Sequence, residues 1–340
     1  MALTTLATVI KVNSIDGVDT VGGDGTYGYA SFQYAIDDQA DLGATGTTIE
    51  VVGDFTLSAA LDYTGWATAP VEQTKRRTVI GVGRLTVGDG LKPTITTSAQ
   101  FDSSGHNGLS FINLDITTSH SSGYLMNGST GTHVQFCDVS GTNTAGVATT
   151  STRGYFIGNT VDCPSASAGL ISTTSGIVLG NSVRVGRAAL YISTSGCISF
   201  NSVVVETAAT DIAIKMNGDY GQCTHNTVYA ANGCTSGISI NAGALNDWTA
   251  AMNYVEGFTN GIDGVSTAYP GSVFGNIMYN NTTDYDAVEA FAESNNTSAS
   301  YSLLMANKFI ASNELMQLIP GIGAPVNQLH FRRRLPKLRA

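Results

Sequence analysis

Asn159-Thr-Val161 is the first copy of a pattern that decides the fold of this chain: an asparagine, a small or variable residue, and an apolar residue. The asparagines of successive copies are 22, 20, 25, 27 and 23 residues apart. Two earlier segments, Leu114-Asp-Ile116 and Cys137-Asp-Val139, keep the apolar position without the asparagine. The later copies are Asn181-Ser-Val183, Asn201-Ser-Val203, Asn226-Thr-Val228, Asn253-Tyr-Val255 and Asn276-Ile-Met278.

A second series of apolar residues follows the first at a shorter offset and with a similar spacing. A repeat of about 22 residues predicts a stacked solenoid, in which each coil buries its apolar face only against its neighbours. The apolar runs are short and bounded by Gly, Ser, Thr and Asn, as in Gly176-Ile-Val-Leu179, which is typical of strands. The second series consists of Leu125, Val147, Leu170, Leu190, Ile212, Ile238 and Ile262.

The composition agrees with such coils. The 39 glycines suit tight corners, and charged residues make up 12 % of the 340 residues, about half of the usual share. A net charge of −10 argues against nucleic acid as a partner. No apolar stretch of about 20 residues is present, which argues against a membrane span. The five cysteines are expected to be reduced, small apolar fillers, with a Cys223–Cys234 disulfide as the alternative.

A short helix is expected near the N-terminus, over residues 31–42, with Ser31 as its N-cap and Gly43 at its end. The chain begins without a basic segment ahead of its first apolar residues, so we expect synthesis in the cytoplasm without a signal peptide, a trimmed leader being the alternative. The apolar face of the helix consists of Phe32, Ala35, Ile36 and Ala40. Strands are expected at residues 8–12, 48–52, 55–57, 78–82 and 94–96.

Three stretches of the N-terminal region are Asp24-Gly-Thr-Tyr27, Ser31-Phe-Gln-Tyr-Ala-Ile-Asp37 and Gly46-Thr-Thr-Ile-Glu-Val-Val-Gly-Asp-Phe-Thr-Leu57. Together they resemble the opening of the pectate-lyase-like right-handed parallel β-helices, and the resemblance covers roughly residues 20–290. It implies that the helix caps the first coil, because an exposed terminal coil presents unpaired strand edges.

The expected fold is therefore all-β: a single-stranded right-handed parallel β-helix solenoid with coils of about 22 residues. We expect a strand and a capping helix in residues 1–45, the β-helix in residues 46–290, and a C-terminal cap with a basic tail in residues 291–340. In the tail, residues 303–318 form an apolar, helix-compatible run that suits a cap or an attachment element.

The repeated asparagines are interpreted as a structural ladder. Amides stacked at the strand spacing can each donate to the coil on one side and accept from the coil on the other. Asparagine also tolerates the left-handed backbone conformation that a coil corner needs. The ladder is expected to consist of Asn159, Asn181, Asn201, Asn226, Asn253 and Asn276.

One step past the apolar position, a further series of residues should point outward if the apolar residues point inward. Asp162 and Arg184 would then be stacked neighbours, either in a solvated strip of ion pairs or as a general acid and base. Arg187, Glu206, Asp211 and Lys215 extend this charged patch. The full outward series is Asp162, Arg184, Val204, Tyr229, Glu256 and Tyr279.

The catalytic groups implied by the resemblance are not recognisable in the sequence. Glycoside hydrolases of this fold need two carboxylates held roughly 5–10 Å apart, and lyases use clustered acidic Ca²⁺ ligands. Asp115 and Asp138, 23 residues apart, are expected to stack, but two carboxylates fall short of the six to eight oxygens that Ca²⁺ takes. We therefore assign no catalytic residue, metal or cofactor. Tyr229, Tyr254, Phe258 and Tyr279 are expected to pack or, alternatively, to stack on sugars.

The last ten residues concentrate basic charge, and without them 11 basic residues stand against 26 acidic ones. We expect this tail to bind an acidic surface, which is a partner, a neighbouring copy or the chain's own acidic body. Bacteriophage virions use such β-helices as capsid decorations, fibres and tailspikes, often as trimers, so the leading hypothesis is a non-enzymatic virion surface component that forms a homo-oligomer. The alternative is a carbohydrate-active or receptor-binding spike that recognises polysaccharide. The partner-binding residues are Arg332, Arg333, Arg334, Lys337 and Arg339.

Overall fold

The chain divides into two compact units, Met1–Ser298 and Ala299–Ala340. The structure, a computed structural model, describes residues 8–20, 27–38, 47–62, 77–83, 92–101, 109–128, 131–142, 146–150, 153–207, 212–217, 220–240, 248–264, 271–286, 290–294 and 297–299. The 303–318 run and the five basic residues of the tail lie outside the described residues.

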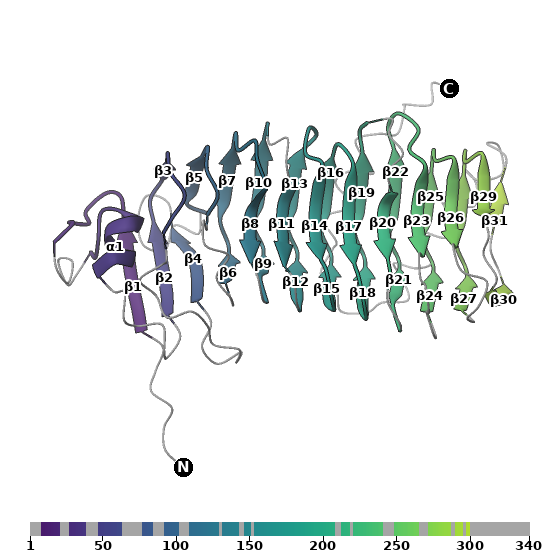
Figure 1. Cartoon of the computed structure of the whole chain (residues 1–340), viewed down its shortest axis with the longest axis horizontal. Helices are drawn as coiled ribbons and strands as arrows, with labels where there is room; N and C mark the ends of the chain where they lie inside the picture. Colours follow the sequence, from purple (N-terminus) through teal and green to yellow (C-terminus); the bar gives the residue numbers. More distant parts are fainter. Residues whose placement is uncertain are drawn as a thin grey trace, which may run out of the picture. The chain divides into compact units, whose positions relative to one another are not determined.

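The first unit is a parallel β-solenoid in which each complete coil contributes one strand to each of three sheets, called A, B and C here. Successive coils lie side by side along the stack (Figure 1). Sheet A consists of β1 (Thr8–Asn13), β2 (Thr47–Val52), β4 (Arg77–Gly83), β6 (Leu109–Ile112), β9 (His133–Gln135), β12 (Gly154–Ile157), β15 (Gly176–Leu179), β18 (Gly196–Ser199), β21 (Gln222–Thr224), β24 (Trp248–Ala251), β27 (Gly271–Phe274) and β30 (Ala290–Ser294).

Sheets B and C have the same parallel order, with each strand bonded to those of the coils before and after it. Sheet B consists of β3 (Phe55–Leu57), β5 (Thr94–Thr97), β7 (Asp115–Thr118), β10 (Asp138–Gly141), β13 (Thr160–Cys163), β16 (Ser182–Val185), β19 (Ser202–Val205), β22 (Thr227–Ala230), β25 (Tyr254–Glu256), β28 (Ile277–Tyr279) and β31 (Thr297–Ala299).

Sheet C begins later in the chain and closes each coil from there on. It consists of β8 (Tyr124–Gly128), β11 (Gly146–Thr150), β14 (Ala168–Ser172), β17 (Ala188–Ile192), β20 (Ile212–Met216), β23 (Ser236–Ile240), β26 (Asn260–Gly264) and β29 (Thr283–Asp286).

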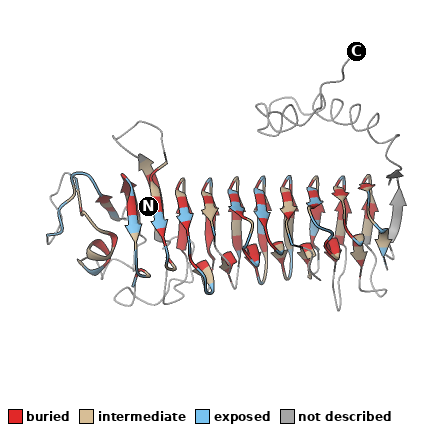
Figure 2. Ribbon diagram, turned by 90° about the horizontal axis from the view of Figure 1, so that it is seen from above, coloured by how far each residue is buried: buried red, intermediate tan, exposed pale blue. Residues whose placement is uncertain are grey.

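The core consists of stacked columns of apolar side chains, one for each sheet, and Figure 2 shows buried and exposed residues along the coils. The apolar position of the repeat forms the column of sheet B, as the sequence predicts. Each member lies opposite its counterpart in the next coil and is almost completely buried, because alternation along a strand points every second side chain inward. The column is Ile116, Val139, Val161, Val183, Val203, Val228, Val255 and Met278.

The second predicted series is correct in four of its seven members. Leu170, Leu190, Ile238 and Ile262 lie in one column of sheet C, but the member between Leu190 and Ile238 is Ile214, not the half-buried Ile212. The earlier members are Met126 and Ala148, one residue past those expected. Leu125 and Val147 are nevertheless buried, because two consecutive residues of these strands face the core.

The N-terminal helix is present as α1 (Phe32–Asp38), which begins directly after Ser31 as expected. It buries Phe32, Ala35 and Ile36, while Ala40 lies outside the described residues. Phe32 packs edge-on against Phe55 of β3, with ring centroids 4.8 Å apart. The helix therefore covers the core at the first coils, next to β1 (Figure 1). All five predicted N-terminal strands are present as β1 to β5.

Candidate functional site

The corner between sheets A and B is a tight turn of two residues that is repeated in successive coils. Its first residue has a positive φ, between 55° and 66° in eight coils, and its second residue points into the core. The second residue is the asparagine of the repeat in six coils. The first residue is Asn113, Phe136, Gly158, Gly180, Phe200, His225, Met252 and Gly275 along the stack.

The six asparagines form the predicted ladder. The Nδ2 of each of the first five donates to the Oδ1 of the asparagine in the next coil, at 2.9–3.0 Å, as in Asn159 to Asn181. The same Nδ2 donates to a main-chain carbonyl of the preceding coil, for example Val134 for Asn159. The backbone N of the same five asparagines also donates to the next Oδ1, so these buried amides are well satisfied.

One part of the ladder prediction was wrong. The left-handed conformation belongs to the residue before each asparagine, and none of the six asparagines has a positive φ. The amide side chain is required at the corner for its hydrogen bonds, whereas the tight turn is made one residue earlier.

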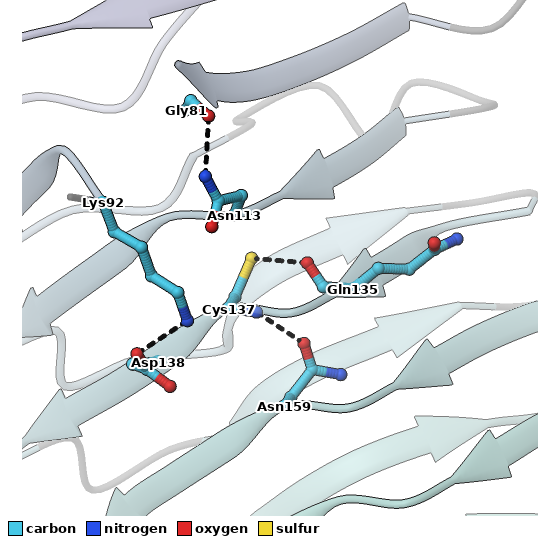
Figure 3. A network of polar contacts seen from close by, with 7 residues as sticks. All are labelled: Gly81, Lys92, Asn113, Gln135, Cys137, Asp138 and Asn159. Carbon is cyan, nitrogen blue, oxygen red and sulfur yellow. Dashed lines mark hydrogen bonds and ion pairs between the residues drawn. The ribbon is translucent and has the colours of Figure 1, made fainter. Parts of the chain in front are cut away.

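The ladder starts at Cys137, which occupies the asparagine position one coil before Asn159 (Figure 3). Its backbone N donates to the Oδ1 of Asn159 at 3.0 Å, and its thiol donates to the carbonyl of Gln135. Next to it, Lys92 forms an ion pair of 2.7 Å with Asp138. No sequence motif indicated this pair, because Lys92 and Asp138 are 46 residues apart and only the stacking brings them together.

The outward series of sheet B is confirmed by the strand register, which places its members one coil apart. Arg184 bridges three coils: its Nη1 lies 3.4 Å from Asp162 of the coil before, and its Nε lies 2.6 Å from Glu206 of the coil after. The hydrogen bond to Glu206 and the charges of both carboxylates raise the pKa of Arg184. All three side chains are solvent-accessible, so each ion pair contributes at most about 1 kcal/mol.

The same face continues into a cluster of tyrosines around Glu256. Tyr229 and Tyr279 flank Glu256 in the neighbouring coils, and the hydroxyl of Tyr254 donates to its carboxylate. Burial and then this hydrogen bond raise the pKa of Tyr254 well above its ordinary value. Phe258 does not belong to this surface, because it is 2 % exposed and packs in the core.

Of the other predicted charged residues, Lys215 does not extend this patch, whereas the place of Arg187 in it stays a prediction. Lys215 lies on the outer face of sheet C, with its ammonium 5.5 Å from the ring of Tyr191, and Asp211 lies outside the described residues. Further along sheet C, Asp263 and Asp286 are neighbours in adjacent coils. Burial, and then the charge of Asp286, raise the pKa of Asp263, while a hydrogen bond from Ser236 opposes the rise.

Asp115 and Asp138 are paired across β7 and β10, as predicted, and the Lys92 ammonium binds the second of them. Among the described residues, no group of three or more His, Cys, Asp or Glu side chains is placed to hold a metal ion. In the same part of the chain, no helix is long and apolar enough to cross a membrane.

The cysteines are free thiols, and Cys223 and Cys234 are not bonded to one another. Burial raises the pKa of Cys137 and of Cys163 to about 12, so both remain protonated at neutral pH. Four of the five thiols are buried, which agrees with their predicted role as small apolar fillers.

The fold and these surfaces define the chain as a parallel β-solenoid with an internal asparagine ladder. Comparison with protein-family models, with curated proteins and with solved structures gave no match to the chain.

Proposed function

We propose that the chain is a non-enzymatic structural subunit of a larger assembly, and specifically a surface, decoration or fibre component of a bacteriophage virion. The proposal rests on the ion pairs that charged side chains of the outer faces form between neighbouring coils. Arg184 binds carboxylates of the coils on both sides, and Lys92 binds Asp138. Side chains held in this way connect neighbouring coils and stiffen the outer surface of the solenoid.

The core supports the same proposal. The ladder links six consecutive coils through buried amides, and each sheet adds a continuous apolar column. Such a body is held by nearest-neighbour interfaces that repeat along its length, which suits a rigid structural element of an assembly better than a site that must rearrange. The basic residues 332–339 of the tail supply the attachment element in this proposal.

Particle incorporation tests this function. Full-length chain and a variant lacking residues 321–340 would be supplied to particles assembled without the native subunit, and bound chain measured after sedimentation. Incorporation of the full chain and loss of the truncated one are expected. Equal incorporation of both would remove the attachment role of the tail, and failure of the full chain to bind particles would refute the assembly function.

The tyrosine cluster on sheet B favours a second candidate, a receptor-binding spike that recognises polysaccharide. Tyrosine rings stack on sugar rings, and a carboxylate accepts hydrogen bonds from sugar hydroxyls, so Tyr229, Glu256 and Tyr279 form a chemically suitable row. Binding to a glycan panel would establish this candidate if Tyr229→Ala and Glu256→Gln abolish it. Oligosaccharide release, lost on Asp162→Ala or Glu206→Ala, would indicate an enzyme instead.

A further inference from the structure

The outer face of sheet A differs from the other two faces in carrying no charge over most of its length. From β6 to β27, every second residue points away from the core, and none of these outward residues is Asp, Glu, Lys or Arg. By contrast, the outer faces of sheets B and C hold the acids and bases described above. In a chain with a net charge of −10, this face is therefore the one that a like-charged molecule can approach most closely.

The centre of this face is also apolar. In β12 and β15 the outward residues are Tyr155, Ile157, Ile177 and Leu179, and Ile177 is 37 % exposed. The neighbouring corner adds Phe136 and Phe200, which are 52 % and 49 % exposed. A contiguous apolar area of this kind on a solvated protein marks an interaction surface.

Backbone strain at the corner supports the same interpretation. Phe136, Phe200 and Met252 have φ of 55°, 58° and 57°, a region that bulky residues avoid because their Cβ crowds the backbone. Glycine meets the same requirement without strain at the equivalent positions Gly158 and Gly180. The turn therefore does not need these large side chains, although they remain about half exposed and the strain persists.

We infer that the uncharged face of sheet A, together with the Phe136–Phe200–Met252 corner, is a self-association surface that binds a second copy of this chain. Two features favour a second copy over another protein. Copies that carry the same net charge repel each other least through an uncharged face. Both copies also repeat at the same strand spacing of about 4.8 Å, so the rows of side chains on one fit between those on the other.

The size of the face is sufficient for a two-fold interface in which the same surface meets itself. The seven spacings of about 4.8 Å between eight strands, with four strand residues and one corner residue at about 3.4 Å each, give an area of about 34 Å by about 17 Å. That is roughly 600 Å² for each copy and roughly 1,200 Å² for the pair, within the range of specific interfaces.

The inference is tested by measuring the self-association of the full chain. Sedimentation or light scattering would follow it over a concentration range on the order of a hundredfold. The test variant is Ile177→Lys, and the matched control is Ser182→Lys, an exposed residue of the same coil on sheet B. Because a lysine would be buried against an apolar surface, Ile177→Lys should weaken self-association by more than about tenfold. Ser182→Lys should associate as the wild type does.

A second variant separates docking from folding. Phe136→Gly removes an exposed ring and the strain at its backbone, so we expect weaker association with no loss in the melting temperature of the dissociated chain. A lower melting temperature with unchanged association would assign Phe136 a purely structural role and overturn the inference at this corner.

The inference deepens the proposed function by naming one partner, and the two can fail separately. A wild-type chain that stays monomeric throughout the concentration range, or an Ile177→Lys variant that associates as well as Ser182→Lys, overturns the self-association surface. If the monomeric chain still enters particles, the proposed function stands without the self-association surface.

Discussion

Asn181 donates two hydrogen bonds to the single Oδ1 of Asn201 in the next coil, one from its backbone N and one from its Nδ2, both at 2.9 Å. Asn201 repeats the arrangement with Asn226. Each rung thus fixes both the side chain and the corner backbone of the coil before it, inside a region from which water is excluded. A buried donor that loses its acceptor pays the full cost of desolvation, so this relationship controls the stability of the corner.

Replacing a central rung should therefore be costly. Asn201→Ala leaves the backbone N and the Nδ2 of Asn181 without their acceptor, and we expect a loss of at least about 3 kcal/mol in the free energy of unfolding. Denaturant unfolding measures it. Ser202→Ala, at the adjacent half-buried residue, is the control and should change stability by less than about 0.5 kcal/mol. Similar losses in both variants would contradict the importance of the ladder.

Replacing Cys137 with asparagine, at the first rung of the ladder, should increase the stability of the chain. Cys137 already donates its backbone N to Asn159, so an asparagine at this position could add a side-chain bond to the same Oδ1. We expect Cys137→Asn to raise the free energy of unfolding by about 1 kcal/mol, the net value of a typical hydrogen bond. Cys137→Ser serves as the control, because serine lacks the length of the amide. A lower melting temperature for the asparagine variant than for the serine variant would show that the ladder cannot be extended here.

Two glycines at the same corner separate backbone strain from side-chain crowding. Gly158 and Gly180 have φ of 65° and 66°, and a Cβ at Gly158 would meet the ring of Phe136 at 2.8 Å, whereas one at Gly180 would meet no atom within 4 Å. Gly180→Ala should cost about 1–2 kcal/mol from strain alone. Gly158→Ala should cost more, and the double variant Phe136→Gly with Gly158→Ala should recover the difference. Equal losses in the free energy of unfolding for Gly158→Ala and Gly180→Ala would mean that the Phe136 ring does not lie against Gly158.

Asp263 should make stability depend on pH. Its folded pKa lies above the ordinary value of 3.8, so the folded chain holds a proton more tightly than the unfolded chain. The stability from this proton is fully present below pH 3.8 and is lost as pH rises through the folded pKa. Asp263→Asn should therefore raise the melting temperature at pH 7 but leave it unchanged below that ordinary pKa.

Asp286→Asn provides the comparison, because it removes only the neighbouring charge and leaves the burial of Asp263. We expect a smaller gain at pH 7 than for Asp263→Asn. A melting temperature that falls at pH 7 in both variants would mean that the stacked carboxylates stabilise the solenoid.

The repeat made the main features of the fold predictable, because the rule that links them is local. A strand alternates its side chains, so the position of Val161 relative to Asn159 was enough to place one inward and the other at the corner. The same rule placed Asp162 and Arg184 side by side on the outer face. Asp138 is different: its partner Lys92 lies in an irregular segment before β5, where no repeat indicates which coil it will meet.

Local reasoning failed where the coil length changes. Paired residues of this column are 20 positions apart from Leu170 to Leu190 and 24 positions apart in each of the next three coils. Counting along the chain therefore selected Ile212, whereas inter-strand hydrogen bonding aligned Ile214 with the column. The prediction of the left-handed residue at the corner was wrong for another reason. Asparagine commonly adopts positive φ, but here the glycines at Gly158 and Gly180 identified the residue that does so, and the sequence already contained that signal.

The sequence by itself determined the class of fold, the inward column and the identity of the six ladder asparagines, because a periodic pattern specifies one coil and stacking repeats it. Only the tertiary structure decided that the outer face of sheet A is uncharged and partly apolar. Residues such as Tyr155 and Ile177 are 22 positions apart in the chain, yet they share a face because parallel strands from successive coils lie at hydrogen-bonding distance. The charge and the apolar area of that face depend on residues from several coils, so no single segment of the sequence reveals them.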